Sequence, residues 1–284
     1  MPLSGHLYRT EAGLQFKTAV QHMPMLEEVY FSRGFDLMQI HGILVDLSHL
    51  RVLDLSKICI LNDRLPWDAF KKGTSPITSL AISGFEDSSD ILHRLVAWPA
   101  KLEHFSFVEC GGEDSRPWSL STIASVISPH KTTLRSLTIG EVQERGLVNF
   151  DLTDFESLEH LSLSAWATGF GAGYETNLLA PRLTKFCWSF TTRRLGVIDF
   201  DEEQENWLRR FAAAAVERKL PLREIYIEFS MQPCSGQCVS TNDIYPWDRM
   251  KHIARGIQAR GISLSWEDPN IDKEMWEDFF GPLT

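Results

Sequence analysis

The chain has 284 residues, of which 43% are hydrophobic and 23% charged, so it is long enough for one large domain or two ordinary ones and is not disordered as a whole. Its formal net charge of -10 and the lack of any block rich in lysine and arginine predict that it has no nucleic acid partner and no membrane partner. There is no basic segment followed by an apolar one at the amino terminus, no apolar run of roughly 18 residues, and an odd number of scattered cysteines, which together predict a cytoplasmic or nuclear protein.

One apolar pattern, with leucine-like residues at its first, fourth and sixth positions, returns along the chain. A weak last copy, Ile262/Leu264/Trp266, keeps only the alternating half. The first residues of the full copies are 24, 27, 25, 32, 24, 25 and 39 positions apart, and five of these steps fall in the window of about 20–29 residues typical of leucine-rich repeats. The eight full copies are Leu26/Val29/Phe31, Leu50/Leu53/Leu55, Ile77/Leu80/Ile82, Leu102/Phe105/Phe107, Leu134/Leu137/Ile139, Leu158/Leu161/Leu163, Leu183/Phe186/Trp188 and Leu222/Ile225/Ile227.

The spacing within each copy predicts a strand with one buried side. The last two apolar residues are two positions apart, so on a strand they point into the core while their neighbours face solvent. No such coil buries its apolar row alone, and neighbouring coils must therefore stack. We predict an α/β fold, a leucine-rich-repeat solenoid with a curved parallel β-sheet on the concave face and helices and irregular segments on the convex face. It comprises an N-terminal cap at 1–22, about nine irregular coils at 23–270 and a C-terminal helical cap at 271–284.

Helices are predicted in the segments that return from one strand to the next. Their signals are cap residues, helical spacing of apolar residues, acids in the first turn and bases in the last. Two long helices explain why the late repeats are longer than the early ones. In chain order the predicted helices cover 88–96, 119–126, 201–219, 246–260 and 273–280.

The repeat openings at 23–29 and 98–105, Met-Pro-Met-Leu-Glu-Glu-Val and Trp-Pro-Ala-Lys-Leu-Glu-His-Phe, resemble those of the leucine-rich-repeat region of fungal F-box proteins. In that family the repeats hold the substrate of a ubiquitin ligase, and the F-box recruits a Skp-type adaptor and a cullin. The ninth repeat position departs from the common Asn or Cys, since only Cys110 fits, so the turns should be irregular. We find no F-box-like Leu-Pro-x-Glu segment before the first repeat. The resemblance therefore implies a protein-binding module that recognises substrates or serves as a scaffold.

The solvent-facing strand positions are the predicted binding surface. They are small and rich in hydroxyl groups in the middle repeats and larger at both ends, which suits a protruding protein ligand. The alternative is that small residues merely fit on a curved sheet. The candidate binding residues are Tyr30, Asp54, His104, Ser106, Ser136, Thr138, His160, Ser162, Trp166, Cys187, Tyr226 and Glu228.

A second hypothesis is an enzyme acting on a small molecule in the small-residue cup. His104 and His160 would exchange protons with the substrate, with Asp54 as a further candidate, although two exposed histidines on a polar face explain the pattern more simply. Cys187 could act as a thiol nucleophile only if a neighbour lowered its pKa. We assign no catalytic residue on sequence grounds.

No metal and no cofactor are expected. Cys234 and Cys238 have metal-like spacing but lack a second pair of ligands. The glycine-rich segment 169–173 lacks the Lys-Ser/Thr of a phosphate loop and is interpreted as a loop near the rim. Of the nine tryptophans, Trp118 and Trp166 fall in turns where they could line a pocket, whereas the others suit packing.

Overall fold

The computed structural model describes residues 15–16, 18–20, 22–23, 25–31, 37–56, 70–85, 88–108, 118–169, 173–191, 200–230 and 244–280. The chain forms two compact units. The first unit comprises Met1–Trp118 and Thr122–Thr138, and the second comprises Ser119–Ser121 and Ile139–Thr284. Among the described residues, no helix combines the length and the apolar character that crossing a membrane requires.

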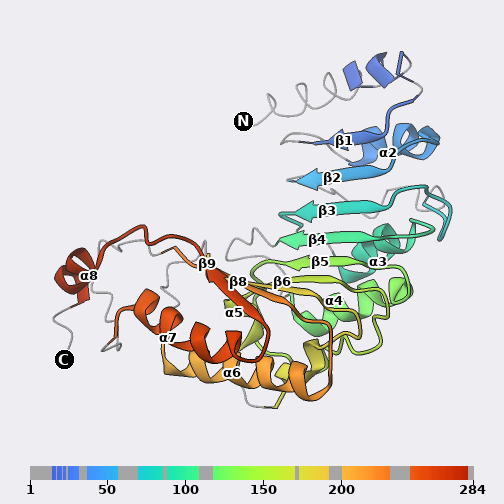
Figure 1. Cartoon of the computed structure of the whole chain (residues 1–284). Coiled ribbons are helices and arrows are strands. Elements are labelled where there is room, and N and C mark those ends of the chain that lie inside the picture. Colours follow the sequence, from blue (N-terminus) through green and yellow to red (C-terminus); the bar gives the residue numbers. More distant parts are fainter. Residues whose placement is uncertain are drawn as a thin grey trace. The chain divides into compact units, whose positions relative to one another are not determined.

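The first unit is built on parallel strands that follow one another in chain order (Figure 1). Their register aligns the apolar rows, since Val29 is opposite Leu53, and Leu53 is opposite Leu80. Leu80 is in turn opposite Phe105. Every second side chain is therefore buried, as the repeat predicted. The strands are β1 (Glu28–Tyr30), β2 (Val52–Ser56), β3 (Ser79–Ser83), β4 (His104–Val108) and β5 (Ser136–Ile139), whose last residue belongs to the second unit.

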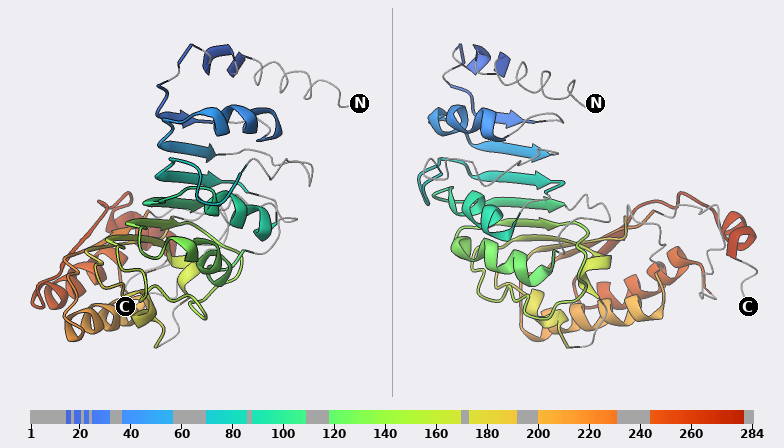
Figure 2. Two further views of the ribbon diagram at one scale, coloured as in Figure 1. Left: turned by 90° about the vertical axis from the view of Figure 1, so that its right-hand side faces the viewer. Right: turned by 180° about the vertical axis from the view of Figure 1, so that it is seen from behind.

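Helices cover one side of the strands of the first unit. These are α2 (Leu37–Asp46), α3 (Ser89–Ala97) and most of α4 (Leu120–Ile127), followed by the 3-10 helix η2 (Ser128–His130). Figures 1 and 2 show α2 and α3 on the same side of β1–β4. The helix α3 buries an apolar stripe at helical spacing, which closes the core over the buried strand residues: Ile91, Leu92, Leu95 and Val96.

The second unit repeats this arrangement, with longer crossovers after β7 and β8. Its strands β6 (His160–Ser164), β7 (Lys185–Ser189), β8 (Glu224–Glu228) and β9 (Ser263–Trp266) are parallel and in chain order. The register continues unbroken from Phe186 to Ile225 to Leu264. The late, irregular repeats therefore keep their predicted register, because a slip by one residue would move the whole apolar row to the solvent side.

Two long helices fill the crossovers of the second unit. They are α6 (Glu202–Glu217) and α7 (Pro246–Gln258), which run side by side (Figure 2). A capping box begins α6, in which the Asp201 carboxylate accepts from the backbone N–H of Glu203 at 2.7 Å and Gln204 Oε1 accepts from the Asp201 N–H at 2.7 Å. Shorter elements complete the unit: α5 (Ala165–Thr168), η3 (Glu175–Leu178) and α8 (Lys273–Phe280).

The core of the second unit is rich in aromatic residues. Trp188 of β7 stacks on Trp207 of α6 with ring centroids 4.5 Å apart, and Trp207 stacks in turn on Phe211 at 5.4 Å. The cluster continues with the ring contact between Phe229, directly after β8, and Trp247 of α7. These tryptophans are fully buried, which confirms the prediction that they serve packing.

The structure confirms the α/β class, the parallel strands and the five predicted helices, and corrects three details. Trp118, for which the sequence left open a place in a pocket lining, is instead buried against the rings of Phe85 and Phe107. Trp266, predicted to be in the core, is only half-buried, since in the described part β9 pairs with β8 alone. The helix α2 was not predicted.

The side chain of His130 forms hydrogen bonds both with the end of α3 and with the segment just before β4 in the first unit. Its Nε2 is 2.7 Å from the Val96 carbonyl, and its Nδ1 is 3.4 Å from the Leu102 N–H. A carbonyl only accepts and an N–H only donates, so the ring is neutral with its proton on Nε2. Burial is the main cause that lowers the pKa of His130 below its usual 6.5.

We expect His130→Phe to lower the free energy of unfolding by about 1–3 kcal/mol, because it leaves two buried backbone groups unsatisfied. Since the pKa is depressed in the folded state, the stability that His130 provides is complete above its unfolded value near 6.5. That stability is lost as pH falls through the folded pKa, so the difference between wild type and variant should shrink in acid. Urea unfolding at pH 7.5 and 5 measures it, with the exposed His93→Phe on α3 as the matched control.

Candidate functional site

The side chains opposite the buried rows form one polar face in each unit, and each predicted binding residue is exposed or half-buried. We call the face of β1–β5 the first strand face and the face of β6–β9 the second strand face. The first consists of Glu28, Tyr30, Val52, Asp54, Ser79, Ala81, Ser83, His104, Ser106, Val108, Ser136 and Thr138. The second consists of His160, Ser162, Lys185, Cys187, Ser189, Glu224, Tyr226, Glu228, Ser263, Ser265 and Glu267.

Tyr30 is the most prominent aromatic residue of the first strand face. It is 64% exposed, and its hydroxyl donates a hydrogen bond to Glu28 Oε2 at 2.9 Å. This hydrogen bond is the main cause that raises the pKa of Tyr30. Met23 and Met25, directly before β1, are also exposed. An exposed tyrosine held by a neighbour, beside flexible apolar side chains, is typical of surfaces that contact other proteins.

The middle of the first strand face is made of small side chains, as predicted. Asp54 is opposite Ala81, which is opposite Ser106, and His104 is opposite Ser79. His104 stands exposed at the start of β4. Asp54 is therefore two strands and one solvent-facing position away from His104.

The second strand face is more charged. Lys185 and Glu224, opposite each other on β7 and β8, form an ion pair of 2.8 Å with both side chains about two-fifths exposed. Such an exposed pair contributes little to stability, at most about 1 kcal/mol. In the next row, Ser162, Cys187 and Tyr226 stand opposite one another across β6, β7 and β8.

The surroundings of Cys187 do not lower the pKa of its thiol. Burial raises the pKa of its thiol, and although a hydrogen bond with Ser162 acts in the opposite direction, the net shift is upward. The residue opposite His160 is Lys185 rather than Cys187. A reactive cysteine requires a lowered pKa, so this environment does not support an activated thiol at Cys187, which stays a prediction.

Glu228 and Glu267 form an acidic end to the second strand face. Glu267 follows β9 directly, and its N–H donates to the carbonyl of Ile227, which places it beside Glu228. Burial, with the charge of Glu228 as a second cause, raises the pKa of Glu267. Sequence reasoning missed Glu267, although its position two residues after Ser265 could have shown that it continues the same face.

We expect Glu267→Gln to raise Tm at pH 7 by about 1–2 °C, since surface changes stay within about 0.5 kcal/mol. The pKa is raised in the folded state, so the ionised carboxylate destabilises the fold at neutral pH. This penalty disappears as pH falls through the folded value toward the usual 4.5, and the gain should therefore vanish near that pH. Thermal unfolding followed by circular dichroism tests this, with the adjacent exposed Asp268→Asn as control.

Trp166 lies at the rim of the second strand face, on α5 directly after β6. It is half-buried, and the guanidinium of Arg145 is stacked over its ring. Ser164, which the strand pattern predicted to face solvent, is buried, because α5 begins there and the Ser164 hydroxyl accepts from the Trp166 N–H at 3.2 Å. Trp166, expected in a turn, thus lies on a short helix, and its contact with Arg145 was not foreseen.

The catalytic candidates belong to different units, with Asp54 and His104 in the first and His160 in the second. Both histidines are exposed. Within the described ranges no three His, Cys, Asp or Glu residues are grouped as ligands of a metal ion. Cys59, Cys110, Cys234 and Cys238 and the middle of the glycine-rich loop, 170–172, lie outside those ranges. The catalytic hypothesis stays a prediction.

No known protein-family model matches this chain, and no curated protein is significantly similar to it in sequence. The function is therefore inferred from the two strand faces and their rims.

Proposed function

We propose that this chain is a leucine-rich-repeat solenoid that binds another protein through its strand faces and the adjoining rim loops. The repeated apolar pattern and the parallel strands in chain order support the fold. In such solenoids the solvent-facing side of the strands is the usual binding surface, and this part of the argument is an analogy between folds.

The observation that carries the proposal is the composition of the two faces. Each presents an exposed or half-buried tyrosine, Tyr30 or Tyr226, among charged and hydroxyl side chains in a common register. Tyrosine contributes large contact area at low cost in side-chain entropy and is enriched at energetically important positions of protein interfaces.

A role as the substrate-recognition part of a ubiquitin ligase extends this proposal and rests on the resemblance to fungal F-box proteins. It implies that the F-box function comes from a further segment or from another chain, and that the protein acts in the cytoplasm or nucleus. Copurification of a Skp-type adaptor would support this extension. A stoichiometric partner without an adaptor would leave the binding proposal intact and contradict the ligase role.

The test is affinity purification of the tagged chain from its source organism under reducing conditions, with quantitative mass spectrometry of proteins and small molecules. We expect a stoichiometric protein partner whose recovery falls at least about tenfold in one of two double variants, because loss of a central interface residue costs about 2 kcal/mol or more. These variants are Tyr30→Ala/Asp54→Ala on the first strand face and Lys185→Ala/Tyr226→Ala on the second.

The control is His93→Ala/His252→Ala, which replaces two exposed residues of α3 and α7 away from the strand faces. Its partner recovery should equal that of the wild type. Equal recovery by all three variants would contradict binding through the strand faces. A retained metabolite in place of a protein would instead favour the enzyme hypothesis, which His104→Ala/His160→Ala would then test.

A further inference from the structure

Arg145 and Trp166 form a cation–π contact at the edge of the second strand face. The guanidinium carbon of Arg145 is 3.0 Å from the centroid of the Trp166 ring. A cation over the face of an indole is attracted by the electrons of the ring, most strongly for tryptophan. The stack covers one face of the guanidinium and leaves its edge, where the N–H donors point, available to a ligand.

The backbone around this stack is fixed from several directions. The N–H of Gly146 donates to the Ala167 carbonyl at 2.9 Å, which joins the loop carrying Arg145 to the helix carrying Trp166. At Gly169, which has a φ of +54°, an added Cβ would be 3.3 Å from the Gly146 Cα. A side chain at this position would therefore separate the two segments, so the glycine allows their close approach.

The helix α5 is itself anchored to the core. The Thr168 hydroxyl donates to the Ala165 carbonyl at 2.9 Å and accepts from Trp188 Nε1 at 3.3 Å. Trp188 is completely buried. The platform beneath Arg145 is thus connected to the aromatic core of the second unit, so little conformational entropy remains to be lost on binding.

The charge of Arg145 is not used inside the described part of the protein. Arg145 is exposed, and no carboxylate of that part forms a hydrogen bond or an ion pair with it. Partial burial lowers the pKa of Arg145, yet an arginine remains charged at neutral pH. The chain has a net charge of -10, so acidic side chains are plentiful. That Arg145 pairs with none of them in the described part is therefore not explained by solubility or by internal ion pairing.

We propose that Arg145 and Trp166 form an anchor that binds the carboxylate of an aspartate or glutamate side chain on the protein partner. This inference rests on the proposed function and names the chemistry that the partner must present at this rim. A carboxylate matches the fork of guanidinium N–H donors and accepts two hydrogen bonds at once. A single negative charge suits the site better than a dianionic phosphate, because the neighbouring Glu144 and the overall acidity repel additional negative charge.

The experiment is selection of binders from a displayed random-peptide library on the immobilised full chain, followed by affinity measurement of selected peptides by fluorescence anisotropy. Peptides from the wild type should be enriched in Asp and Glu, and changing the enriched acid to its amide should weaken binding. Arg145→Gln should raise Kd at least about tenfold, and Trp166→Ala should have a similar effect. Arg145→Lys should restore only part of the affinity, because lysine lacks the planar fork.

Arg182→Gln is the matched control, since Arg182 is another exposed arginine of the second unit. Circular dichroism of each variant checks that the fold is retained. Peptides that bind without acidic enrichment, or that bind Arg145→Gln as tightly as wild type, would overturn the anchor while leaving the proposed function in place. Stronger competition by inorganic phosphate than by acetate would assign the anchor to phosphate instead. A selection that yields no binder also counts against the anchor. The proposed function is tested independently by the affinity purification.

Discussion

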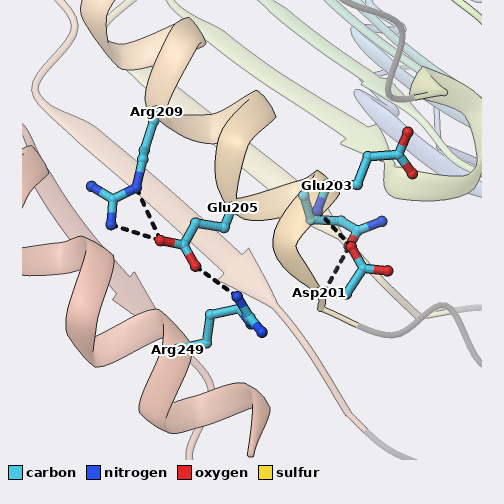
Figure 3. Close-up of polar contacts among 6 residues, drawn as sticks. Asp201, Glu203, Glu205, Arg209 and Arg249 are labelled. Atoms are coloured by element: carbon cyan, nitrogen blue, oxygen red, sulfur yellow. Dashed lines mark hydrogen bonds and ion pairs between the residues drawn. The ribbon is translucent and has the colours of Figure 1, made fainter. Parts of the chain in front are cut away.

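Replacing Glu205 by alanine is expected to lower the free energy of unfolding by about 3–5 kcal/mol, because it leaves a buried arginine without its partner. Glu205 accepts hydrogen bonds from Arg209 Nε at 3.0 Å and Nη2 at 2.7 Å, and from Arg249 Nη1 at 2.9 Å (Figure 3). The side chains of Glu205 and Arg249 are only 13% and 11% exposed. Glu205 therefore offsets one of the two positive charges between α6 and α7, and urea unfolding followed by circular dichroism measures its contribution.

The control for this prediction is Glu203→Ala, two residues earlier on α6, whose side chain is exposed. It should cost less than about 1 kcal/mol, the range of interactions with a helix dipole. The double variant Glu205→Leu/Arg249→Met should recover most of the lost stability, since apolar residues often replace a buried ion pair without penalty. A loss below about 1 kcal/mol for Glu205→Ala would contradict the role assigned to the ion pair.

The same network has a pH dependence. Burial acts to raise the pKa of Glu205, but the hydrogen bonds and charges of Arg209 and Arg249 outweigh it and bring the pKa below the usual 4.5. A depressed carboxyl pKa contributes stability that is present above the unfolded value and lost as pH falls through the folded value. The difference between wild type and Glu205→Ala should therefore be largest at neutral pH and shrink below about pH 4.5.

Trp207→Ala is expected to have an effect of similar size, about 3–5 kcal/mol, because it opens a cavity in a packed aromatic core. Trp207 is completely buried and lies between Trp188 and Phe211, on which it stacks. Aromatic pairs of this kind add stability beyond the area that they bury. Thermal and urea unfolding measure the loss, and the reduced fluorescence change on unfolding identifies Trp207 as a reporter of this core.

The informative comparison is Trp207→Phe. Trp207 Nε1 is buried and has no acceptor among the described residues, so phenylalanine removes volume but breaks no hydrogen bond. Trp188→Phe, in contrast, also loses the hydrogen bond from Nε1 to Thr168. We therefore expect Trp207→Phe to be less destabilising than Trp188→Phe, and the reverse order would show that Trp207 Nε1 is satisfied in solution.

The buried row and the solvent-facing side of each strand could be predicted because two independent constraints coincide in the sequence. Alternation within each copy fixes which side is buried, and the recurrence of the copies fixes which residues stand opposite one another. The pairing of Lys185 with Glu224 was predictable in this way even across the longest spacing. Helix α2 was missed although Asp36 directly precedes it, because its first turn has no acidic residue and its last turn no basic residue, whereas the first turn of α6 is rich in glutamates.

The candidate site was only partly predictable, because its important contacts join segments with no sequence relation. Glu267 acquires a raised pKa from burial and from Glu228, neither of which the sequence displays. Arg145 and Trp166 are brought together by the hydrogen bond from Gly146 to Ala167, which depends on two loops rather than on a repeat. The burial of Trp118 was likewise left open, since turn position alone does not reveal whether a side chain points inward.

Pairing in chain order has a consequence for how the protein is made. Each strand pairs with a segment that follows soon after it, as Glu28 does with Val52 and Lys185 with Glu224. Contacts between near neighbours along the chain require little loop closure, which favours rapid folding. During synthesis each strand can therefore join its predecessor as soon as it leaves the ribosome, so its apolar row is exposed to the crowded cell only briefly.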